Sequence, residues 1–328
     1  ALWLGLRTAQ PGIRGFLWQL FYIAEAGVLA EHLRREGAFH LHNHFGNSSC
    51  SVAMIASAMA AVPYSYTLHG PMELFEPMGW RIDQKIARAS FVACISHFAR
   101  SQGMLFSDPA HWNRMHVVHC GVVPALYETS ARPAGAEPVL LFVGRLAAIK
   151  GLGLLLEAVA ALRPRYPGLR LVLVGDGPDR GQLEARAAQP DLAGAVTFAG
   201  YRSQAEVARD LAACDVFVLP SFAEGVPVVL MEAMASCRPV VATRVAGVAE
   251  LVEDGVSGHL VPPGDVAGLT RAIEALLADP ERRRRMGETG RRQVERAFDV
   301  EREATWLLTV LKAWRLGGPT PGLRPTPA

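Results

Sequence analysis

Two glutamates, Glu224 and Glu232, bracket seven uncharged residues in the stretch EGVPVVLME (224–232). An unpaired carboxylate is very costly to bury, so a core segment has no use for either charge. Ligands of open α/β sheets bind beyond the carboxyl ends of the strands. Because Glu224 follows the apolar run DVFVLPS (215–221) by three residues, we expect it at such a rim.

The residues between the two glutamates predict the start of a helix. Pro227 suits the first helical position, where its missing N–H costs nothing. The neighbouring backbone amides would then be free at the rim, at Gly225, Val226, Val228 and Val229. Such a helix N-terminus binds phosphates, and Glu232, further inside the helix, can still face the crevice. Carboxylates accept hydrogen bonds from hydroxyls and repel phosphates, so the implied ligand carries both groups, as a nucleotide sugar does.

The stretch GRLAAIKG (144–151) carries two cations, Arg145 and Lys150, between a strand-like run and a helical pattern. Guanidinium and ammonium groups are natural partners of a diphosphate, and they would neutralise the charge that builds up on a departing one. A plainer interpretation is a pair of surface cations near a helix start. Cations in that position oppose the helix dipole, which favours an anionic partner instead.

The second half of the chain alternates strand-like and helical patterns. Its strand-like runs are mostly apolar throughout, which is typical of parallel strands buried on both faces. They cover residues 138–145, 169–177, 195–200, 215–221, 239–244 and 258–263. Helical patterns lie between them at 151–166, 179–189, 203–214 and 227–237, and two or three more helices follow from Asp265 to about Arg315. This order predicts a doubly wound α/β domain.

The first half repeats this pattern in a shorter form, with strands expected at 40–45, 64–70, 91–96 and 115–122. Residues 1–37 predict a loop and a long amphipathic helix. Residues 123–138 lack periodicity and predict a linker between domains, and residues 317–328 predict a disordered tail. The expected domains are 1–128, which is incomplete, 129–299, and a C-terminal helix and tail at 300–328.

The overall composition excludes several classes of protein. The chain has 328 residues, enough for about two domains of ~150 residues, and its net charge of +2 gives no large field for nucleic acid. Its five scattered cysteines form no CxxC pair, which indicates reduced thiols in a cytoplasm. The longest apolar run, at 51–62, is shorter than the ~20 residues that a bilayer requires. We therefore expect a cytoplasmic protein, with weak peripheral contact at the inner face of the membrane as an alternative.

Four motifs occur in a characteristic order, each at a strand end: GRLAAIKG, GDGP (175–178), EGVPVVLMEAMA and the ending PVVATRVAGVAELVEDGVSGHLVPPGD (239–265). In this order they resemble the retaining glycosyltransferases of family 4, which have the GT-B fold of two facing Rossmann-like domains with parallel sheets. The resemblance runs from about His40 to Asp279. The stretches HLHNHF, TLHGP and ISHFARSQ are most similar in sequence to bacterial members of the colanic-acid type, which build exopolysaccharides.

The resemblance implies transfer of a sugar from a nucleoside-diphosphate sugar, of UDP or GDP type, to a saccharide or lipid-linked saccharide acceptor. The anomeric configuration would be retained, and neither a metal nor another cofactor would be needed. Two residues would act at the reacting sugar, Glu224 on its hydroxyls and His69 from the first domain. The other donor contacts implied are Arg145, Lys150 and the amides of Gly225, Val226 and Val228 for the diphosphate, Glu232 for the ribose, backbone near Tyr201 for the base, and Gly177 in the pocket wall.

The chain also departs from this family. Family members open with a strand and a glycine-rich loop, and nothing before His40 resembles them, so we expect the first strand-helix units to be missing here. Val123 stands where the family usually has Asp, and Cys237 where it usually has Gly. We expect both changes to be tolerated.

Several groups of residues admit other interpretations. His40, His42 and His44 alternate and can share one face, but no carboxylate or cysteine at matching spacing supports a metal site. The run at 282–285 is a solvated helix face or, more weakly, a contact with anionic lipid. Aromatic and basic side chains near the start would form either a membrane-facing patch or core packing, at Trp3, Arg7, Arg14, Phe16, Trp18 and Phe21.

Other functions are also open. Because the first domain is short, a non-catalytic nucleotide-sugar-binding protein or an inactive fragment is the main alternative. An epimerase of the GT-B fold is less well supported, because such epimerases lack the combination of the GR-x4-K motif and the glutamate pair. A phosphorylase is less well supported because the sequence shows no motif for the lysine-bound cofactor of those enzymes. A nicotinamide dehydrogenase is least supported, since the third glycine of GDGPDRG comes one position too late for the dinucleotide fingerprint.

Overall fold

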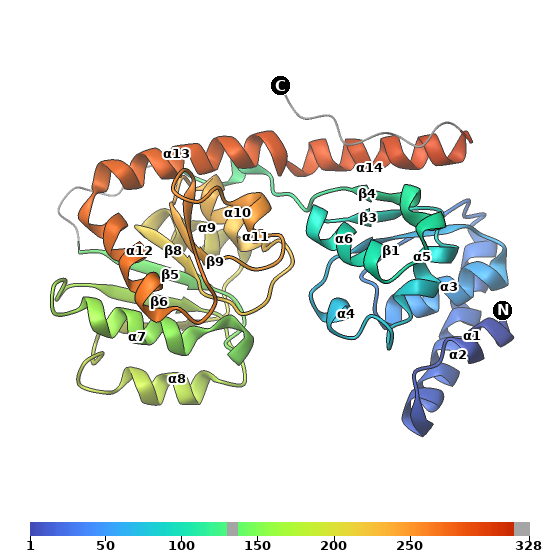
Figure 1. The fold of residues 1–328 in the computed structure, drawn as a ribbon, viewed down its shortest axis with the longest axis horizontal. Coiled ribbons are helices and arrows are strands. Elements are labelled where there is room, and N and C mark those ends of the chain that lie inside the picture. The colour runs from blue at the N-terminus through green and yellow to red at the C-terminus, as the bar shows by residue number, and fades with distance from the viewer. Residues whose placement is uncertain (130–136, 318–328) are drawn as a thin grey trace. The chain divides into compact units, whose positions relative to one another are not determined.

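A computed structural model describes residues 1–129 and 137–317, which form two compact units (Figure 1). Of the described residues, unit 1 contains Ala1–His119 and 303–317, and unit 2 contains the described part of Cys120–Arg302. The predicted boundary after residue 128 therefore differs from the one observed, and the last helix packs with unit 1 instead of standing apart. Residues 130–136 of the predicted linker and residues 318–328 of the predicted tail lie outside the described residues.

Unit 1 is built on a parallel sheet of four strands in the order β1-β2-β3-β4. The strands are β1 (Leu41–His44), β2 (Tyr64–Leu68), β3 (Val92–Cys94) and β4 (Met115–Val117), and each lies inside a run predicted to be a strand. Every residue of β2 is buried. Its sequence, YSYTL, nevertheless alternates apolar and hydroxyl side chains, so the buried faces of this strand include the hydroxyls of Ser65 and Thr67.

The helices of unit 1 begin earlier than expected. Residues predicted as a loop form α1 (Leu2–Arg7), followed by α2 (Gly12–Arg35), which packs on α3 (Ser48–Ala60). The remaining helices are α4 (Met72–Phe75), α5 (Ile82–Arg88), α6 (His97–Leu105), a 3-10 turn at Pro109–Arg114, and the part of α14 (Val300–Arg315) that follows Arg302.

The long helix α14 is attached to unit 1 by polar contacts. The buried Glu303 accepts a hydrogen bond from the His119 amide at 2.9 Å. The Trp306 indole donates to the carbonyl of Val117, at the end of β4, at 2.9 Å. These contacts make the described part of α14 from Glu303 part of the first unit.

The aromatic side chains near the chain start are exposed and do not belong to the core. Trp3, Phe16, Trp18 and Phe21 are 66%, 47%, 51% and 63% exposed, and the Arg7 guanidinium lies 4.2 Å from the centre of the Trp3 ring. Within the two described ranges, no helix has the length and apolar character needed to cross a bilayer.

Unit 2 contains a parallel sheet of six strands in the order β10-β9-β8-β5-β6-β7. The strands are β5 (Val139–Val143), β6 (Arg170–Val174), β7 (Val196–Gly200), β8 (Val216–Leu219), β9 (Val240–Thr243) and β10 (Gly258–Val261), all inside predicted runs. Strand order reverses between β5 and β8, which pair in parallel. Crevices at such reversals are the usual binding sites of open α/β sheets.

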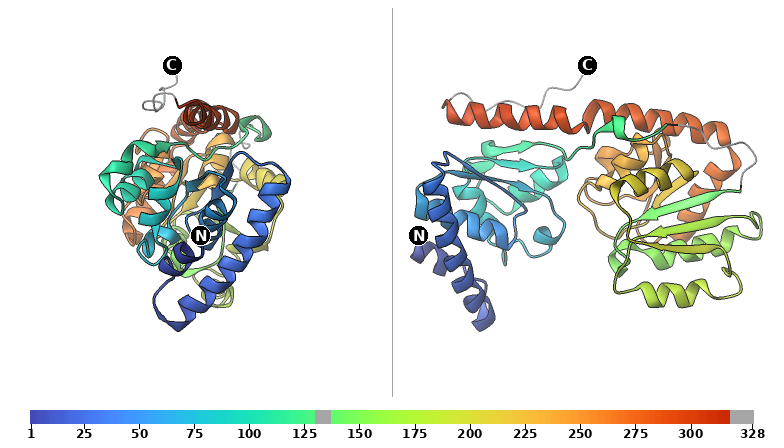
Figure 2. Two further views of the ribbon diagram at one scale, coloured as in Figure 1. Left: turned by 90° about the vertical axis from the view of Figure 1, so that its right-hand side faces the viewer. Right: turned by 180° about the vertical axis from the view of Figure 1, so that it is seen from behind.

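Helices cover both faces of the unit 2 sheet (Figures 1 and 2). They are α7 (Leu152–Leu162), α8 (Arg180–Ala187), α9 (Gln204–Ala213), α10 (Val228–Ala235), α11 (Val248–Leu251), α12 (Val266–Ala278) and α13 (Pro280–Ala297). Short 3-10 turns precede β5 at Pro124–Leu126 and α7 at Ala148–Lys150. On α13, Arg284 pairs with Glu281 and Glu288 at the surface, as a solvated helix face would.

Candidate functional site

The loops that follow β5 and β8 meet at the strand-order reversal of unit 2. The Lys150 ammonium lies 2.6 Å from Oε1 of Glu224, and the Ser221 hydroxyl donates to the same oxygen at 2.6 Å. Glu224 is 8% exposed. Its carboxylate is therefore buried but paired, which answers the cost that burial of a lone charge would carry.

Backbone contacts hold these two loops against each other. Gly151 has φ +66°, and a Cβ atom there would come within 3.0 Å of the Pro220 carbonyl oxygen, closer than real Cβ contacts. The Phe222 amide donates to the Ile149 carbonyl at 2.8 Å. Glycine at position 151 thus lets the Lys150 loop rest directly on the end of β8.

The GDGP loop after β6 also packs against the β5 loop through backbone contacts. The Leu146 amide donates to the Asp176 carbonyl at 2.9 Å. A Cβ atom at Gly175 or Gly177 would fall within 3.0 Å of the carbonyl oxygens of Gly144 and Leu146, respectively. The sequence suggested that Gly177 lines a pocket; the structure gives it this close approach of two loop backbones.

Helix α10 begins one residue later than predicted. Pro227 is its N-cap, with ψ 120°, so the first helical residue is Val228. The extended ψ lets the chain turn from the Glu224 loop into the helix. Among the described residues, no protein acceptor takes the amides of Gly225, Val226, Val228 and Val229. This N-terminus therefore presents free amide donors, which are common partners of bound anions, next to the Lys150–Glu224 pair.

Two other predicted donor contacts, Arg145 and Tyr201, are exposed at the surface. The Arg145 side chain is exposed and, within the described part of the chain, forms no ion pair. Tyr201 is 83% exposed just after β7, where Gly200 has φ +69°.

Glu232 has partners different from those of Glu224. The Tyr127 hydroxyl donates to Oε1 of Glu232 at 2.8 Å, and Gln204 donates to the Tyr127 hydroxyl at 3.4 Å. Burial raises the pKa of Glu232, while the hydrogen bonds from Tyr127 and Gln204 oppose that rise. Sequence reasoning missed Tyr127, because it lies 105 residues from its partner and inside a segment predicted to be a linker.

In unit 1, His69 follows β2 and is held by a buried carboxylate. Glu73, 2% exposed, accepts hydrogen bonds from the amides of His69 at 3.1 Å, Gly70 at 2.9 Å and Gly46 at 3.3 Å. Nε2 of His69 lies 3.0 Å from Nδ1 of His44, so the two rings share one hydrogen bond. Burial lowers the pKa of His69 to about 4, with the His44 ring adding to the effect. Sequence reasoning did not find Glu73 either.

Comparison with known proteins identifies the family. The family model for "Glycosyl transferases group 1" matches residues 128–293. Alpha-D-kanosaminyltransferase of Streptomyces kanamyceticus is 31% identical over 280 residues, covering 78% of this chain and 72% of that protein. The chain belongs to the group 1 glycosyltransferases. This glycosyltransferase is also 40% identical over 169 residues to the lipopolysaccharide core biosynthesis glycosyltransferase LpsE of Rhizobium meliloti, covering 52% of this chain and 48% of LpsE.

Solved structures share the fold of this glycosyltransferase. Sucrose-phosphate synthase from Thermosynechococcus elongatus aligns with a TM-score of 0.80 and 25% identity, covering 89% of this chain and 78% of that one. HepE of Anabaena, in complex with UDP and glucose, aligns with a TM-score of 0.77 and 25% identity, covering 88% and 82%. The GT-B fold with two Rossmann-like domains, expected from the sequence, is confirmed.

The alternating histidines of this glycosyltransferase bond to hydroxyls of β2. His40 and His42 both contact the Ser65 hydroxyl at 2.7 Å, and His42 also contacts the Thr67 hydroxyl at 3.0 Å. Burial lowers the pKa of each of these two rings to about 4. We call His40, His42, His44 and His69 the histidine cluster. In the ranges 1–129 and 137–317, no group of three or more His, Cys, Asp and Glu side chains is arranged to hold a metal ion.

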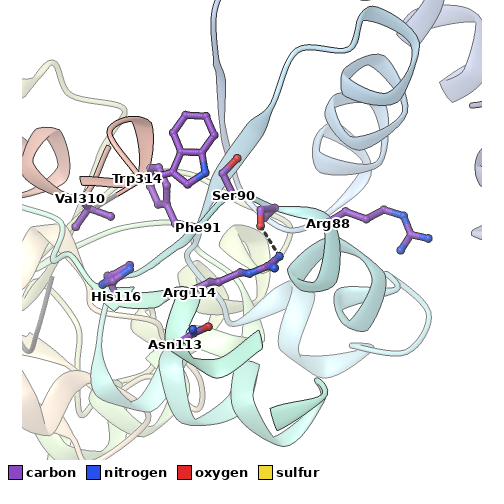
Figure 3. Close-up of a pocket in the computed structure, with 10 residues that line it drawn as sticks. Arg88, Ser90, Phe91, Asn113, Arg114, His116, Val310 and Trp314 are labelled. Carbon is purple, nitrogen blue, oxygen red and sulfur yellow. Dashed lines mark hydrogen bonds between the residues drawn. The ribbon is translucent and has the colours of Figure 1, made fainter. Parts of the chain in front are cut away.

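A pocket of about 470 Å³ also lies in unit 1, beside α14 (Figure 3). Its wall includes Trp314, Phe91 and two arginines, which raises the question of an anion site. Arg114 instead donates to the carbonyls of Ala87 and Ala89 at 3.2 and 3.3 Å, and Arg88 points away from the other labelled side chains. Arg114 is thus bonded to backbone carbonyls and Arg88 points away, so we assign this pocket no function.

Proposed function

We propose that this glycosyltransferase moves a hexosyl group from a nucleoside-diphosphate sugar to a saccharide or lipid-linked saccharide acceptor. The reaction retains the anomeric configuration, needs no metal ion and serves bacterial polysaccharide synthesis. The observation that carries the proposal is the Lys150–Glu224 pair, which lies at the strand-order reversal beside the free amides of α10.

The pair explains how a carboxylate can work next to a diphosphate. Glu224 alone would repel the phosphates, but Lys150 neutralises it at 2.6 Å. Arg145, which has no carboxylate partner among the described residues, adds a further positive charge for the ligand. In the proposed complex, Lys150, Arg145 and the α10 amides bind the diphosphate, and Glu224 accepts hydrogen bonds from the sugar.

The remaining donor contacts follow the family resemblance. Glu232 binds the ribose, backbone near Tyr201 binds the base, and Gly177, whose backbone closely approaches Leu146 of the β5 loop, lines the pocket. His69 of unit 1 acts on the transferred sugar. Its lowered pKa keeps the ring neutral at pH 7, so it exchanges hydrogen bonds with the sugar and brings no charge.

The proposed chemistry needs no protein nucleophile. The bond between the anomeric carbon and the diphosphate oxygen breaks while the acceptor oxygen bonds to the same face of that carbon. The departing phosphate takes the proton of the acceptor hydroxyl. Protein cations and amides stabilise the negative charge that develops on the diphosphate.

Known relatives support the donor and the pathway. HepE was crystallised with UDP-glucose and with UDP and glucose. LpsE acts in lipopolysaccharide core biosynthesis, and AmsK of Erwinia amylovora, 37% identical over 167 residues, acts in amylovoran biosynthesis. A lipid-linked acceptor would place the enzyme in the cytoplasm at the inner membrane surface, where the exposed Trp3 and Arg7 of α1 would meet lipid headgroups.

A thermal-shift panel tests the donor site first. Its ligands are UDP, GDP, ADP and NAD, without metal, on the wild type and on Arg145→Ala. A ligand at a hundred times its Kd stabilises by about 2.7 kcal/mol. We expect one of UDP and GDP to stabilise the wild type and to stabilise Arg145→Ala much less; absence of any diphosphate effect would contradict the proposal.

Sugar transfer distinguishes an enzyme from a binding protein. We expect Glu224→Ala to retain diphosphate binding and to lose transfer from the donor identified by the panel. Full transfer by Glu224→Ala would sink its assignment. A wild type that binds the diphosphate, yet transfers nothing to any saccharide or lipid-linked acceptor, would favour the non-catalytic alternative.

A further inference from the structure

Glu232, the second glutamate of the EGVPVVLME stretch, accepts a hydrogen bond from a tyrosine in a distant part of the sequence. The Tyr127 hydroxyl donates to Oε1 of Glu232 at 2.8 Å, and Gln204 donates to that hydroxyl at 3.4 Å. Tyr127 is 4% exposed, so its hydroxyl has little access to water as an alternative partner. The contact is therefore part of the folded unit and not a chance surface encounter.

One arginine fixes both sides of this contact. Arg291, on α13, donates to the carbonyl of Pro124 at 2.9 Å and to that of Tyr127 at 3.3 Å. The same guanidinium nitrogen also donates to the carbonyl of Ala235, the last residue of α10. The segment that carries Tyr127 and the helix that carries Glu232 are thus held together before any ligand arrives.

The charge state of Glu232 depends on this network. Burial favours the neutral acid and raises its pKa, whereas hydrogen bonds from Tyr127 and Gln204 favour the carboxylate. An ionised carboxylate accepts about four hydrogen bonds and donates none. The Tyr127 hydroxyl fills one of these acceptor positions on Glu232, which leaves room for the two hydroxyls of a vicinal diol. Ribose offers such a diol at its 2′ and 3′ positions, and 2′-deoxyribose does not.

We propose that Tyr127 is a positioning residue that aims Glu232 at the ribose diol and so sets a preference for ribonucleotide over 2′-deoxyribonucleotide donors. This inference rests on the proposed function, which assigns the ribose to Glu232. It adds a residue that touches no ligand and acts through a single hydroxyl.

Calorimetric titration of matched diphosphates tests the inference. The probes are UDP against 2′-deoxy-UDP and GDP against 2′-deoxy-GDP, on the wild type, Tyr127→Phe and Glu232→Ala. The matched control is Tyr166→Phe, since Tyr166 lies between α7 and β6, at the opposite ends of the strands. The readout is the ratio of the two dissociation constants, which a general loss of stability leaves unchanged.

We expect the wild type to prefer the ribo form by roughly 10- to 100-fold, as a hydrogen bond to a charged group allows. Tyr127→Phe should lower this ratio by roughly threefold or more, Glu232→Ala should abolish it, and Tyr166→Phe should preserve it. Gln204→Leu, on the helix surface, is a second variant in case Tyr127→Phe does not fold, and should lower the ratio in the same direction.

The possible outcomes distinguish failure of this inference from failure of the proposed function on which it rests. A ratio unchanged in Tyr127→Phe, or in Gln204→Leu if the first variant is unfolded, overturns the role of Tyr127 while Glu232→Ala still reports the ribose contact. A ratio unchanged in Glu232→Ala also overturns the inference, but leaves diphosphate binding intact. If the wild type binds no diphosphate at all, the proposed function and the inference fail together.

Discussion

The ion pair at the strand-order reversal makes a quantitative prediction about the ligand-free protein. The Lys150 and Glu224 side chains are 21% and 9% exposed and lie 2.6 Å apart. Exposed pairs contribute about 0.2–1 kcal/mol, whereas breaking a buried pair costs about 3–5 kcal/mol. Because this pair is mostly buried, we expect Lys150→Met and Glu224→Gln to show a coupling free energy of about 2 kcal/mol in a double-mutant cycle.

The assay is urea unfolding of the wild type, both single variants and the double variant. At a slope of ~2.5 kcal/mol per M, a coupling of about 2 kcal/mol corresponds to ~0.8 M in the unfolding midpoint of unit 2. Lys150→Met should be the more harmful single change, because it leaves the buried carboxylate with Ser221 as its remaining partner in this cluster. Glu224→Gln leaves a lysine that water can still reach.

Arg244 and Asp254 provide the matched control in the same unit. They lie 2.7 Å apart, but their side chains are 53% and 41% exposed. The cycle on Arg244→Met and Asp254→Asn should give less than about 1 kcal/mol, and salt should reduce it further. Equal coupling free energies in the two cycles would refute the assignment of a buried pair. So would loss of the Lys150–Glu224 coupling when the salt concentration is raised roughly tenfold, to about 0.5 M.

Three further predictions concern loops and titrating groups. Rings of the histidine cluster have pKa values of about 4 in the folded state at His40, His42 and His69, so their contribution to stability is complete above pH ~6.5 and is lost as pH falls toward 4. Lowering the pH from 7 to 5.5 should therefore lower the urea midpoint of unit 1, by less in His40→Gln than in the wild type; no pH dependence in that window would contradict it. Gly177→Ala should cost about 1–3 kcal/mol in unit 2, because its Cβ meets backbone, while Gly181→Ala, with open space around it, should be neutral or stabilising in the same melts. Glu73→Gln should cost about 1–2 kcal/mol in unit 1, because three amides lose a charged acceptor; a melting point equal to wild type would show that these amides bond to water equally well.

The strands could be predicted because a strand buried on both faces has consecutive apolar residues in the sequence. The four residues of β8, for example, are all buried and all apolar. The meeting of Lys150 and Glu224 was also within reach, because each follows a strand and parallel strands end at one edge of a sheet. The strand order reverses where β5 pairs with β8, and ligands bind at such reversals. Doubly wound sheets have such a reversal, so the pairing could be foreseen from the fold class.

Contacts between distant segments were not predictable in this way. Helix α1 was missed because packing stabilises it: Gln19 of α2 donates to the Gly5 carbonyl at 2.8 Å. Tyr127 and Glu73 lie outside the recognised motifs, and their partners are set by tertiary structure. Pro227 was displaced by one residue because both the N-cap and the first helical position accept proline, and only ψ distinguishes them.

The attachment of α14 to unit 1 has a consequence for synthesis on the ribosome. Domains generally fold as units, the N-terminal one first. Here unit 2 is continuous and has all its residues once Arg302 has emerged, but unit 1 still lacks Glu303 and Trp306, which hold the end of β4. The second unit can therefore finish folding before the first. A nascent chain stalled so that residue 302 has just left the ribosomal exit tunnel should carry a protease-resistant unit 2 and an unfinished, cleavable unit 1.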